Sequence, residues 1–415
     1  MKISRIGNIE LFCFFTALLG CSLFWSFFLI SISSLFLAIL FVIELEIYPV
    51  FKIKINPAIK TVFEEINKHP LLLCFVLLFL LGLISYFWSE NTASYLKYNQ
   101  MRLQLLVIPL CILAHKDIPK NYFNWILKIF VLTAVITAFI VLYYYLKNHD
   151  LYIYALKFSK AIYTPIQHIR YTALLVMAFG LCFYLYNETQ NKKVKYAYIL
   201  AAFFLFVMLH ILAVKGSILS LYLVCVALIV TVLARKVSLF LRYALPIGLI
   251  LIFVLSLIFL PSLNKKLQYV RFELEEYHQG KWQNLSDIER LISYEVGLEL
   301  AMKNPILGVG LGDFEDETKR MYLTKWNVSI YKLPHNEILF QFMSLGITGV
   351  LLILGIYYYT LKEKIFRTDF LCLSLIISLF VLQLFNDTLE SQISVGMTVF
   401  VLIIIWNRKN LMERI

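Results

Sequence analysis

The sequence predicts an all-α polytopic membrane protein with about twelve transmembrane helices and one large, partly helical loop. Two observations predict this class. Hydrophobic residues make up 61% of the 415 residues and charged residues only 15%, whereas soluble domains have about 25% charged residues. Apolar runs of about twenty residues, the length that crosses a bilayer as a helix, also recur along the whole chain.

The predicted spans follow one another with mostly short polar connections. They are two segments within residues 10–46, and then 70–88, 101–114, 123–146, 166–186, 196–214, 217–234, 243–261, 336–359, 369–385 and 392–406. The fourth of them is short and contains Pro109. We treat residues 1–415 as a single membrane domain, with a loop of residues 262–334 inserted between the ninth and tenth spans.

The long loop is predicted to be folded. Ser286 and Glu289 have the spacing of a capping box, which binds the first free N–H groups of a helix. Apolar residues then recur with helical period until Asn304 and Pro305 end that helix. With further helices expected at 264–278 and 314–323, the loop is predicted to form a helical cap over the outer end of the bundle.

The distribution of positive charge predicts the orientation. With the N- and C-termini in the cytoplasm, about 20 of the 38 Lys and Arg residues fall in inner segments and about five in short outer loops. The long loop then faces outward, with about ten basic and eleven acidic residues. The net charge of +12 is therefore mostly a topology signal, and we expect no nucleic-acid partner.

Neither the cysteines nor the glycine-rich stretch predicts a cofactor site. The seven cysteines lie in or beside apolar runs, without the spacing of a disulfide framework or a metal site. Gly308-Val-Gly310-Leu-Gly312 superficially matches a phosphate-binding loop, but such a loop follows a strand, and here a helix and Pro305 precede it. We interpret these glycines as a structural turn.

His335 stands where the long loop meets a predicted span. The partial positive charge of a helix N-terminus favours the neutral imidazole, which is the form that can act as a base. Polar residues then follow at helical spacing, namely Glu337, Gln341, Ser344 and Thr348. Such a stripe is expected to line a cavity or a helix contact and not to face lipid. The alternative is that Asn336 only caps the helix and His335 lies in the membrane interface.

Four basic residues fall on the same predicted side of the membrane. Lys215 lies at the outer end of the seventh span, where it either reaches the surface or binds a phosphate. Arg290 either forms a surface salt bridge with a neighbouring glutamate or contributes to a site. His168 and Arg170 begin the sixth span, either as anchors or as a second anion contact. Together these groups fit an anionic, lipid-linked substrate.

Several stretches of the chain form a recognisable pattern. Residues 290–314 read as an Arg-led amphipathic helix followed by a Pro-x-x-Gly-x-Gly turn, and residues 335–349 contain His-Asn-x-x-Leu and then Gly-x-x-Gly. Val214-Lys-Gly-Ser217 stands at the end of a span, and Trp88-Ser-Glu90 follows the third span. In these motifs the chain resembles the O-antigen ligase and O-antigen polymerase superfamily of bacterial membrane glycosyltransferases, over most of its length.

The resemblance implies a GT-C-like fold in the bacterial inner membrane, with the long loop in the periplasm. It implies that a glycan is transferred from an undecaprenyl-diphosphate carrier to lipid A-core or another glycan acceptor, without a metal or other cofactor. His335 would be the general base, and Arg290 would stabilise the departing diphosphate. Asn336, Glu337 and Gln341 would support the base.

The resemblance also implies that Lys215, Arg170 and His168 bind the diphosphate. The motif normally has Arg at the position of Lys215, and Lys offers a point charge in place of a two-pronged donor. We therefore expect Arg170 to share the role. Attack on the face opposite the departing diphosphate would invert the anomeric centre.

Three functions remain open from the sequence. The first is an O-antigen ligase. The second is an O-antigen or exopolysaccharide polymerase, or a protein O-oligosaccharyltransferase, of the same superfamily. The third belongs to another class: a polysaccharide or lipid transporter or flippase, for which internal repeats and broken helices would be expected. The sequence contains no two matching halves, which favours an enzyme.

Overall fold

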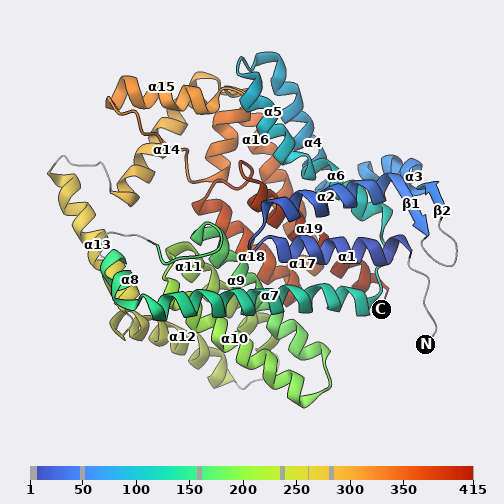
Figure 1. Cartoon of the computed structure of the whole chain (residues 1–415), viewed down its shortest axis with the longest axis horizontal. Helices are drawn as coiled ribbons and strands as arrows, with labels where there is room; N and C mark the ends of the chain where they lie inside the picture. Colours follow the sequence, from blue (N-terminus) through green and yellow to red (C-terminus); the bar gives the residue numbers. More distant parts are fainter. Residues whose placement is uncertain are drawn as a thin grey trace. The chain divides into compact units, whose positions relative to one another are not determined.

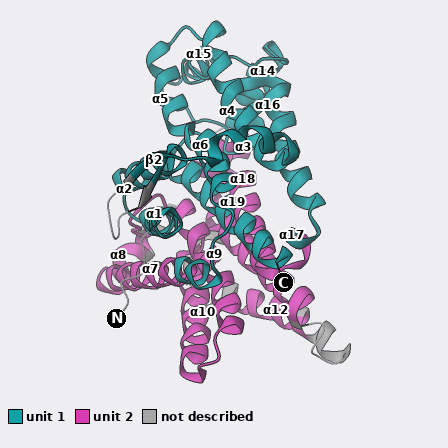
Figure 2. Ribbon diagram, turned by 90° about the vertical axis from the view of Figure 1, so that its right-hand side faces the viewer, with its two compact units in different colours: residues 1–126, 293–366, 386–415 teal, residues 127–292, 367–385 magenta. Residues whose placement is uncertain are grey.

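The computed structural model describes residues 7–46, 52–156, 161–233, 239–259, 261–279 and 285–414. The chain divides into two compact units, which Figure 2 draws in different colours. Unit 1 comprises residues 1–126, 293–366 and 386–415, and unit 2 comprises residues 127–292 and 367–385. The loop predicted at residues 262–334 is thus shared between the two units.

Unit 1 combines helices with one small sheet, as labelled in Figure 1. Its elements are α1 (Asn8–Ser22), α2 (Phe27–Val42), β1 (Ile43–Glu46), β2 (Lys52–Ile55), α3 (Ala58–Glu65), α4 (Pro70–Ile84), α5 (Thr92–Arg102), α6 (Gln104–Ala114), α15 (Phe314–Trp326), α16 (Glu337–Lys362) and α19 (Gln392–Glu413), with 3₁₀ turns at Ile66–Lys68 and Ser85–Trp88. α2 packs against α1 and α6, and α4 packs against α6 and α16. The core of this unit therefore joins segments from both ends of the chain.

Unit 2 contains α8 (His149–Leu156), α9 (His168–Glu188), α10 (Lys192–Leu212), α11 (Lys215–Leu228), a π turn (Ile229–Leu233), α12 (Leu239–Phe259), α13 (Pro261–His278) and α18 (Phe370–Phe385). α7 (Lys120–Lys147), α14 (Ser286–Lys303) and α17 (Lys364–Thr368) each run from one unit into the other. α9 packs against α10, α11 and α18, and most of its residues are buried. Its nearly uninterrupted apolar sequence suits this central place.

A helix lies at each of the twelve predicted spans. Within the described residues, seven stretches are long and apolar enough to cross a membrane: Pro70–Trp88, Lys120–Lys147, His168–Glu188, Lys192–Leu212, Lys215–Val232, Glu337–Lys362 and Gln392–Glu413. α1, α2 and α18 are apolar but shorter. The chain is an all-α polytopic membrane protein apart from one hairpin, and the number of twelve spans stays a prediction.

The fourth predicted span, 101–114, differs from a simple membrane helix. It is divided between the last turn of α5 and the 11-residue α6. At 1.5 Å per residue α6 is about 16 Å long, roughly half the thickness of the hydrocarbon core. Pro109 lies inside α6 and does not end it.

A short antiparallel hairpin stands where only a basic connection was expected. Ile43 of β1 pairs with Ile55 of β2, and Glu44 pairs with Lys54. The alternation of Lys and Ile in residues 52–55 has the period of a strand, and opposite charges across the ladder stabilise the pairing. The positive charge of these lysines, taken alone as a topology signal, does not predict a strand.

The predicted span at 336–359 is not one continuous helix. Gly346 in α16 has φ +67° and ψ −163°, a conformation open almost only to glycine. The glycine-rich turn after α14 fills the break: Val309 N–H donates to the Met343 carbonyl at 3.0 Å, and Ile347 N–H donates to the Pro305 carbonyl at 2.8 Å. The turn thus pairs backbone groups that the break frees with other backbone groups of the protein.

The same turn explains the other glycines of the stretch. Gly310 N–H donates to the Ser344 carbonyl, and Gly312 N–H donates to the Ser89 hydroxyl at 3.1 Å. A Cβ on Gly308 would lie 2.4 Å from the backbone carbon of Ser344. Because these amides are already bonded within the protein, they are not free to hold a phosphate, which supports the interpretation as a structural turn.

The Trp88-Ser-Glu90 stretch docks on this turn as well. The Asp313 carboxylate accepts the backbone N–H of Glu90 at 2.9 Å and that of Asn91 at 2.8 Å. A Cβ on Gly310 would lie 2.5 Å from the Ser89 hydroxyl oxygen. Three of the motif stretches that carry the family resemblance therefore pack on one another within unit 1.

The three helices expected in the long loop are confirmed. α13, α14 and α15 occupy Pro261–His278, Ser286–Lys303 and Phe314–Trp326. At the start of α14, Glu289 N–H donates to the Leu285 carbonyl at 2.8 Å. Glu273 of α13 accepts the Asp287 N–H at 3.2 Å, so a carboxylate from another helix binds the first turn of α14.

Candidate functional site

The start of α16 places His335 just outside a helix, as the sequence predicts. Asn336 is the N-cap, and its side-chain oxygen accepts the Leu339 N–H at 2.9 Å. The preceding Pro334 packs on α14, where a Cβ on Gly297 would come within 3.1 Å of the proline ring. The His335 side chain is 23% exposed, so its ring lies at a partly open position.

The backbone and the ring of His335 are both held by neighbouring groups. Tyr294 of α14 donates its hydroxyl to the His335 carbonyl at 3.0 Å. Asp387 Oδ1 lies 3.9 Å from His335 Nδ1, and Asp387 is only 6% exposed. This distance exceeds a direct hydrogen bond, but a buried carboxylate so close stabilises a positive charge on the imidazole.

The segment that carries Asp387 is fixed by Glu337. The Glu337 carboxylate is fully buried and accepts the N–H groups of Thr388 at 2.5 Å and Leu389 at 3.0 Å. Its other oxygen accepts the Gln341 side-chain amide at 2.6 Å. Glu337, Gln341 and Ser344 are all completely buried, so this part of the polar stripe faces protein, as expected. Thr348, the last residue of the predicted stripe, lies beyond the break at Gly346 and is partly exposed.

Arg102 is a fully buried cation on the far side of the same segment. Its Nε donates to the Leu389 carbonyl at 3.1 Å, and its guanidinium lies 5.7 Å from the centre of the Phe340 ring. We did not single out this residue from the sequence. The available signal was an arginine at the entry to an apolar run, a position that charged residues rarely occupy without a partner.

Lys215 and Arg290, both in unit 2, meet at one carboxylate. The Lys215 ammonium forms an ion pair with Asp287 Oδ2, and Arg290 donates to Asp287 Oδ1 at 3.4 Å. Lys215 is the first residue of α11 and lies two residues after Ala213, whose backbone is left-handed. Arg290 thus forms a salt bridge with Asp287, and this carboxylate joins two of the predicted site residues.

Glu273 adds a second carboxyl group to this cluster. It is 1% exposed, and its oxygens bind the first turn of α14 next to Asp287. Burial raises the pKa of Glu273, and the neighbouring Asp287 carboxylate raises it further. The cluster therefore holds two basic and two acidic groups, one of which binds its proton more tightly than usual.

His168 and Arg170 lie in the first turn of α9, which also belongs to unit 2. The Thr172 hydroxyl donates to the His168 carbonyl at 2.9 Å and lies 2.6 Å from the Ser217 hydroxyl. That second contact joins the N-terminal part of α9 to the first turn of α11, where Lys215 begins the helix. The structure thus brings the N-terminal ends of these two helices together, and helix N-termini favour anions.

The predicted site residues are distributed over both units. His335, Asn336, Glu337 and Gln341 lie in unit 1, and His168, Arg170, Lys215 and Arg290 lie in unit 2. Within the described part of the chain, no group of three or more His, Cys, Asp or Glu side chains has an arrangement that would hold a metal ion.

The fold and these sites define a class of protein. It is a polytopic membrane protein that carries an imidazole–carboxylate pair in unit 1 and a cluster of basic groups at helix ends in unit 2. Residues 200–354 match the family model described as O-antigen ligase, a range that includes Lys215, Arg290 and His335. The match confirms the resemblance to the O-antigen ligase superfamily, whose members are glycosyltransferase-like enzymes. A search of curated proteins found no match.

Proposed function

We propose that the chain is an O-antigen ligase-type glycosyltransferase. It moves a glycan from an undecaprenyl-diphosphate carrier to lipid A-core on the periplasmic face of the inner membrane. The observation that carries the proposal is the placement of His335 next to the buried Asp387, at a partly open helix start inside the family-matched region. Neither a metal nor a nucleotide takes part in the scheme.

His335 acts as the general base. It takes the proton of the acceptor hydroxyl while the oxygen of that hydroxyl bonds to the anomeric carbon of the donor sugar. The bond from this carbon to the diphosphate oxygen breaks, and the diphosphate leaves with the electron pair on its carrier lipid. Asp387 stabilises the imidazolium that results, and attack opposite the leaving group inverts the anomeric centre.

Lys215 and Arg290 bind the diphosphate. In the unliganded chain both contact Asp287, which keeps the two cations close together in a position that phosphate oxygens can take over. Arg170 and His168, at the neighbouring start of α9, add positive charge to the same end of unit 2. Fixed cations of this kind stabilise the charge that develops on a departing diphosphate.

The acceptor sugar occupies a cavity of about 540 Å³ beside the start of α16. Tyr294, Glu295, Leu298, Asn336 and Leu339 line it. An aromatic ring binds sugars by stacking, and a carboxylate binds them by accepting hydrogen bonds from their hydroxyl groups. The cavity adjoins His335 through Asn336, so a hydroxyl held there reaches the base.

The proposal is tested in a strain deleted for this gene and complemented with wild type or His335→Ala. Lipopolysaccharide gels and analysis of carrier-linked glycan are the readouts. Loss of the base is expected to lower transfer by about 10²–10⁴-fold. Lys215→Met and Arg290→Met test the diphosphate contacts, and Arg320→Met, which changes an exposed cation on α15, is the matched control.

The outcomes separate the alternatives. Full-length polymer that accumulates on the carrier while the polymer ladder is lost supports a ligase. Lipid A-core with a single repeat and no polymer on the carrier points to a polymerase, and an unchanged ladder points to another glycan or to protein glycosylation. A transporter or flippase would be indicated if His335→Ala restored every defect while lipid translocation depended on the protein.

A further inference from the structure

A groove of unit 1 lies apart from the residues assigned to transfer. It has a volume of about 460 Å³ and opens between α2, α5, α6 and the start of α19. The residues that line it are Ser31, Ser34, Leu35, Ala38, Lys97, Gln100, Met101, Leu103, Gln104, Val107, Ile108 and Gln392. The Gln392 side chain of α19 donates to the Ser31 hydroxyl of α2, which joins the two helices at the rim of the groove.

The lining changes from polar to apolar in the same direction along two helices. On α2 the hydroxyl groups of Ser31 and Ser34 come first, and Leu35 and Ala38 follow one turn deeper. On α6 the first residue is Gln104, and Val107 and Ile108 follow it. A molecule that fills the groove therefore meets polar groups at the helix starts and an apolar wall deeper in, which is the polarity of a membrane lipid.

The polar end of the groove favours a ligand that carries a negative charge and hydroxyl groups. Lys97 is the one charged residue among those that line the groove. Its side chain is half exposed, and its ammonium lies 3.9 Å from the Glu315 carboxylate, a distance at which a lipid phosphate can compete for it. Gln104 is 6% exposed, and its side-chain oxygen has no hydrogen-bond partner within the described residues. A buried hydrogen-bond acceptor without a partner costs stability. This position therefore favours a ligand with a hydroxyl group that donates a hydrogen bond to it.

We propose that this groove binds an anionic phospholipid, namely phosphatidylglycerol. The lipid phosphate pairs with Lys97, a glycerol hydroxyl donates to the Gln104 oxygen, and one acyl chain lies along Leu35, Val107 and Ile108. The site is independent of the proposed transfer reaction, since none of its residues is assigned to the base, the diphosphate or the acceptor cavity.

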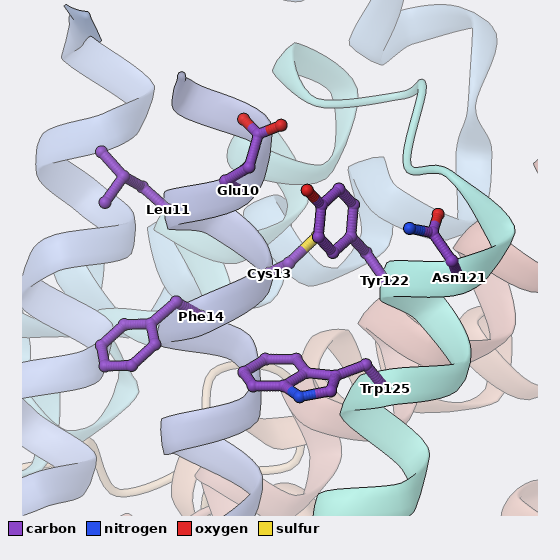
Figure 3. A pocket seen from close by; sticks show the side chains of 7 residues that line it. All are labelled: Glu10, Leu11, Cys13, Phe14, Asn121, Tyr122 and Trp125. Carbon is purple, nitrogen blue, oxygen red and sulfur yellow. The ribbon is translucent and has the colours of Figure 1, made fainter. Parts of the chain in front are cut away.

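A second groove of unit 1 supplies an internal contrast. It has a volume of about 570 Å³ and lies between α1 and the start of α7, as Figure 3 shows. Its walls include Phe14 and Trp125, but its one charged residue is the acidic Glu10. The carboxylate repels a phosphate, so this apolar groove is not expected to prefer an anionic lipid.

Native mass spectrometry of the full-length protein in mild detergent tests the proposal. Phosphatidylglycerol and phosphatidylcholine with the same acyl chains are titrated, so that only the headgroup differs. Choline carries a positive charge and no hydrogen-bond donor. Wild type is expected to bind phosphatidylglycerol about tenfold more tightly, the size of one charge-assisted hydrogen bond. Lys97→Met and Gln104→Leu are each expected to abolish most of this preference. Lys193→Met, at an exposed lysine of α10, and Glu10→Gln, in the contrasting groove, should leave it intact.

Three results would overturn the assignment. Equal binding of the two lipids by wild type would remove the headgroup preference, and an unchanged preference in Lys97→Met would remove the proposed phosphate contact. Displacement of phosphatidylglycerol by undecaprenyl phosphate, molecule for molecule, would reassign the groove to the carrier lipid. Lys97 is exposed, so its variant is expected to fold and to keep the test valid if Gln104→Leu does not.

Discussion

Asp387 is the partner that gives His335 its proposed chemistry. Its carboxylate lies 3.9 Å from the ring nitrogen Nδ1 and is nearly excluded from solvent. Asp387→Asn removes the charge without changing the shape of the side chain. Because the imidazolium then loses its stabilisation, we expect glycan transfer to fall about tenfold to a hundredfold. The measurement is the initial rate with a purified lipid-linked donor.

The control for Asp387→Asn is Asp150→Asn. The Asp150 side chain is fully exposed on α8, so the same chemical change there should leave the rate at the wild-type value. An Asp387→Asn protein that is folded and transfers glycan at the wild-type rate would contradict the role of the carboxylate.

Glu273 makes the stability of unit 2 depend on pH. Its pKa is raised in the folded chain by burial and by Asp287, so its contribution to stability is present at low pH and is lost as pH rises through the folded-state pKa. Glu273→Gln has no proton to lose. Between about pH 4 and pH 8, the thermal midpoint of the Glu273→Gln variant should therefore fall less than that of wild type.

Glu275→Gln is the matched control for the measurement of the thermal midpoint at different pH values. Glu275 lies on the same helix, α13, but is exposed, so its variant should follow the wild-type curve. Parallel curves for wild type and Glu273→Gln would show that the buried carboxyl does not govern the pH dependence.

The sequence led to only part of the site, for a physical reason. His335, Asn336 and the stripe of Glu337 and Gln341 were found because they are neighbours in the chain and share one helix. Asp287, Asp387 and Arg102 were missed because tertiary folding, and not helical period, brings them to their partners. The sequence gives one indication of Asp387, namely that it lies in a short polar segment between two apolar runs.

At the scale of elements, the break in α16 is the feature that a single substitution tests best. A Cβ on Gly346 would lie 2.2 Å from the Ile306 carbonyl oxygen, and its φ of +67° disfavours any other residue. Gly346→Ala is expected to cost about 2 kcal/mol or more and to lower the thermal midpoint in detergent by several degrees.

Gly248→Ala is the control for the break. Gly248 lies in α12, and a Cβ there meets nothing within 4 Å. Alanine in a helix is favoured over glycine by about 0.5–1 kcal/mol, so this variant should keep or slightly raise the midpoint. Equal effects of the two alanines would refute the importance of the break.

Hydropathy predicted where helices occur but not how they are interrupted or paired. Every predicted span contains a helix, since long apolar runs have few other stable forms in a membrane. The break at Gly346 depends on the turn that begins at Pro305, some forty residues earlier in the chain. The hairpin of β1 and β2 was missed because its lysines were interpreted by charge alone.

At the scale of the whole molecule, the proposed orientation is open to a labelling test. The seven native cysteines are free thiols, and all except Cys21 are buried, so the wild type should react little with a membrane-impermeant maleimide. Ser329→Cys, in the long loop, is expected to react in intact spheroplasts. Lys193→Cys, in the first turn of α10, should react only after the membrane is permeabilised. The reverse pattern would place the loop in the cytoplasm.

The turn that fills the break in α16 also has a consequence for biosynthesis. Residues 305–310 leave the ribosome before residues 337–362, so the partner of the break already exists when α16 is made. The turn must nevertheless reach the same side of the membrane as the first half of α16 before the two can interlock. In the proposed orientation the loop is exported, and a delay in its export would leave the Gly346 backbone groups unpaired in a lipid environment, where they are most costly. Translocation of the loop is therefore a step on which the folding of this helix depends.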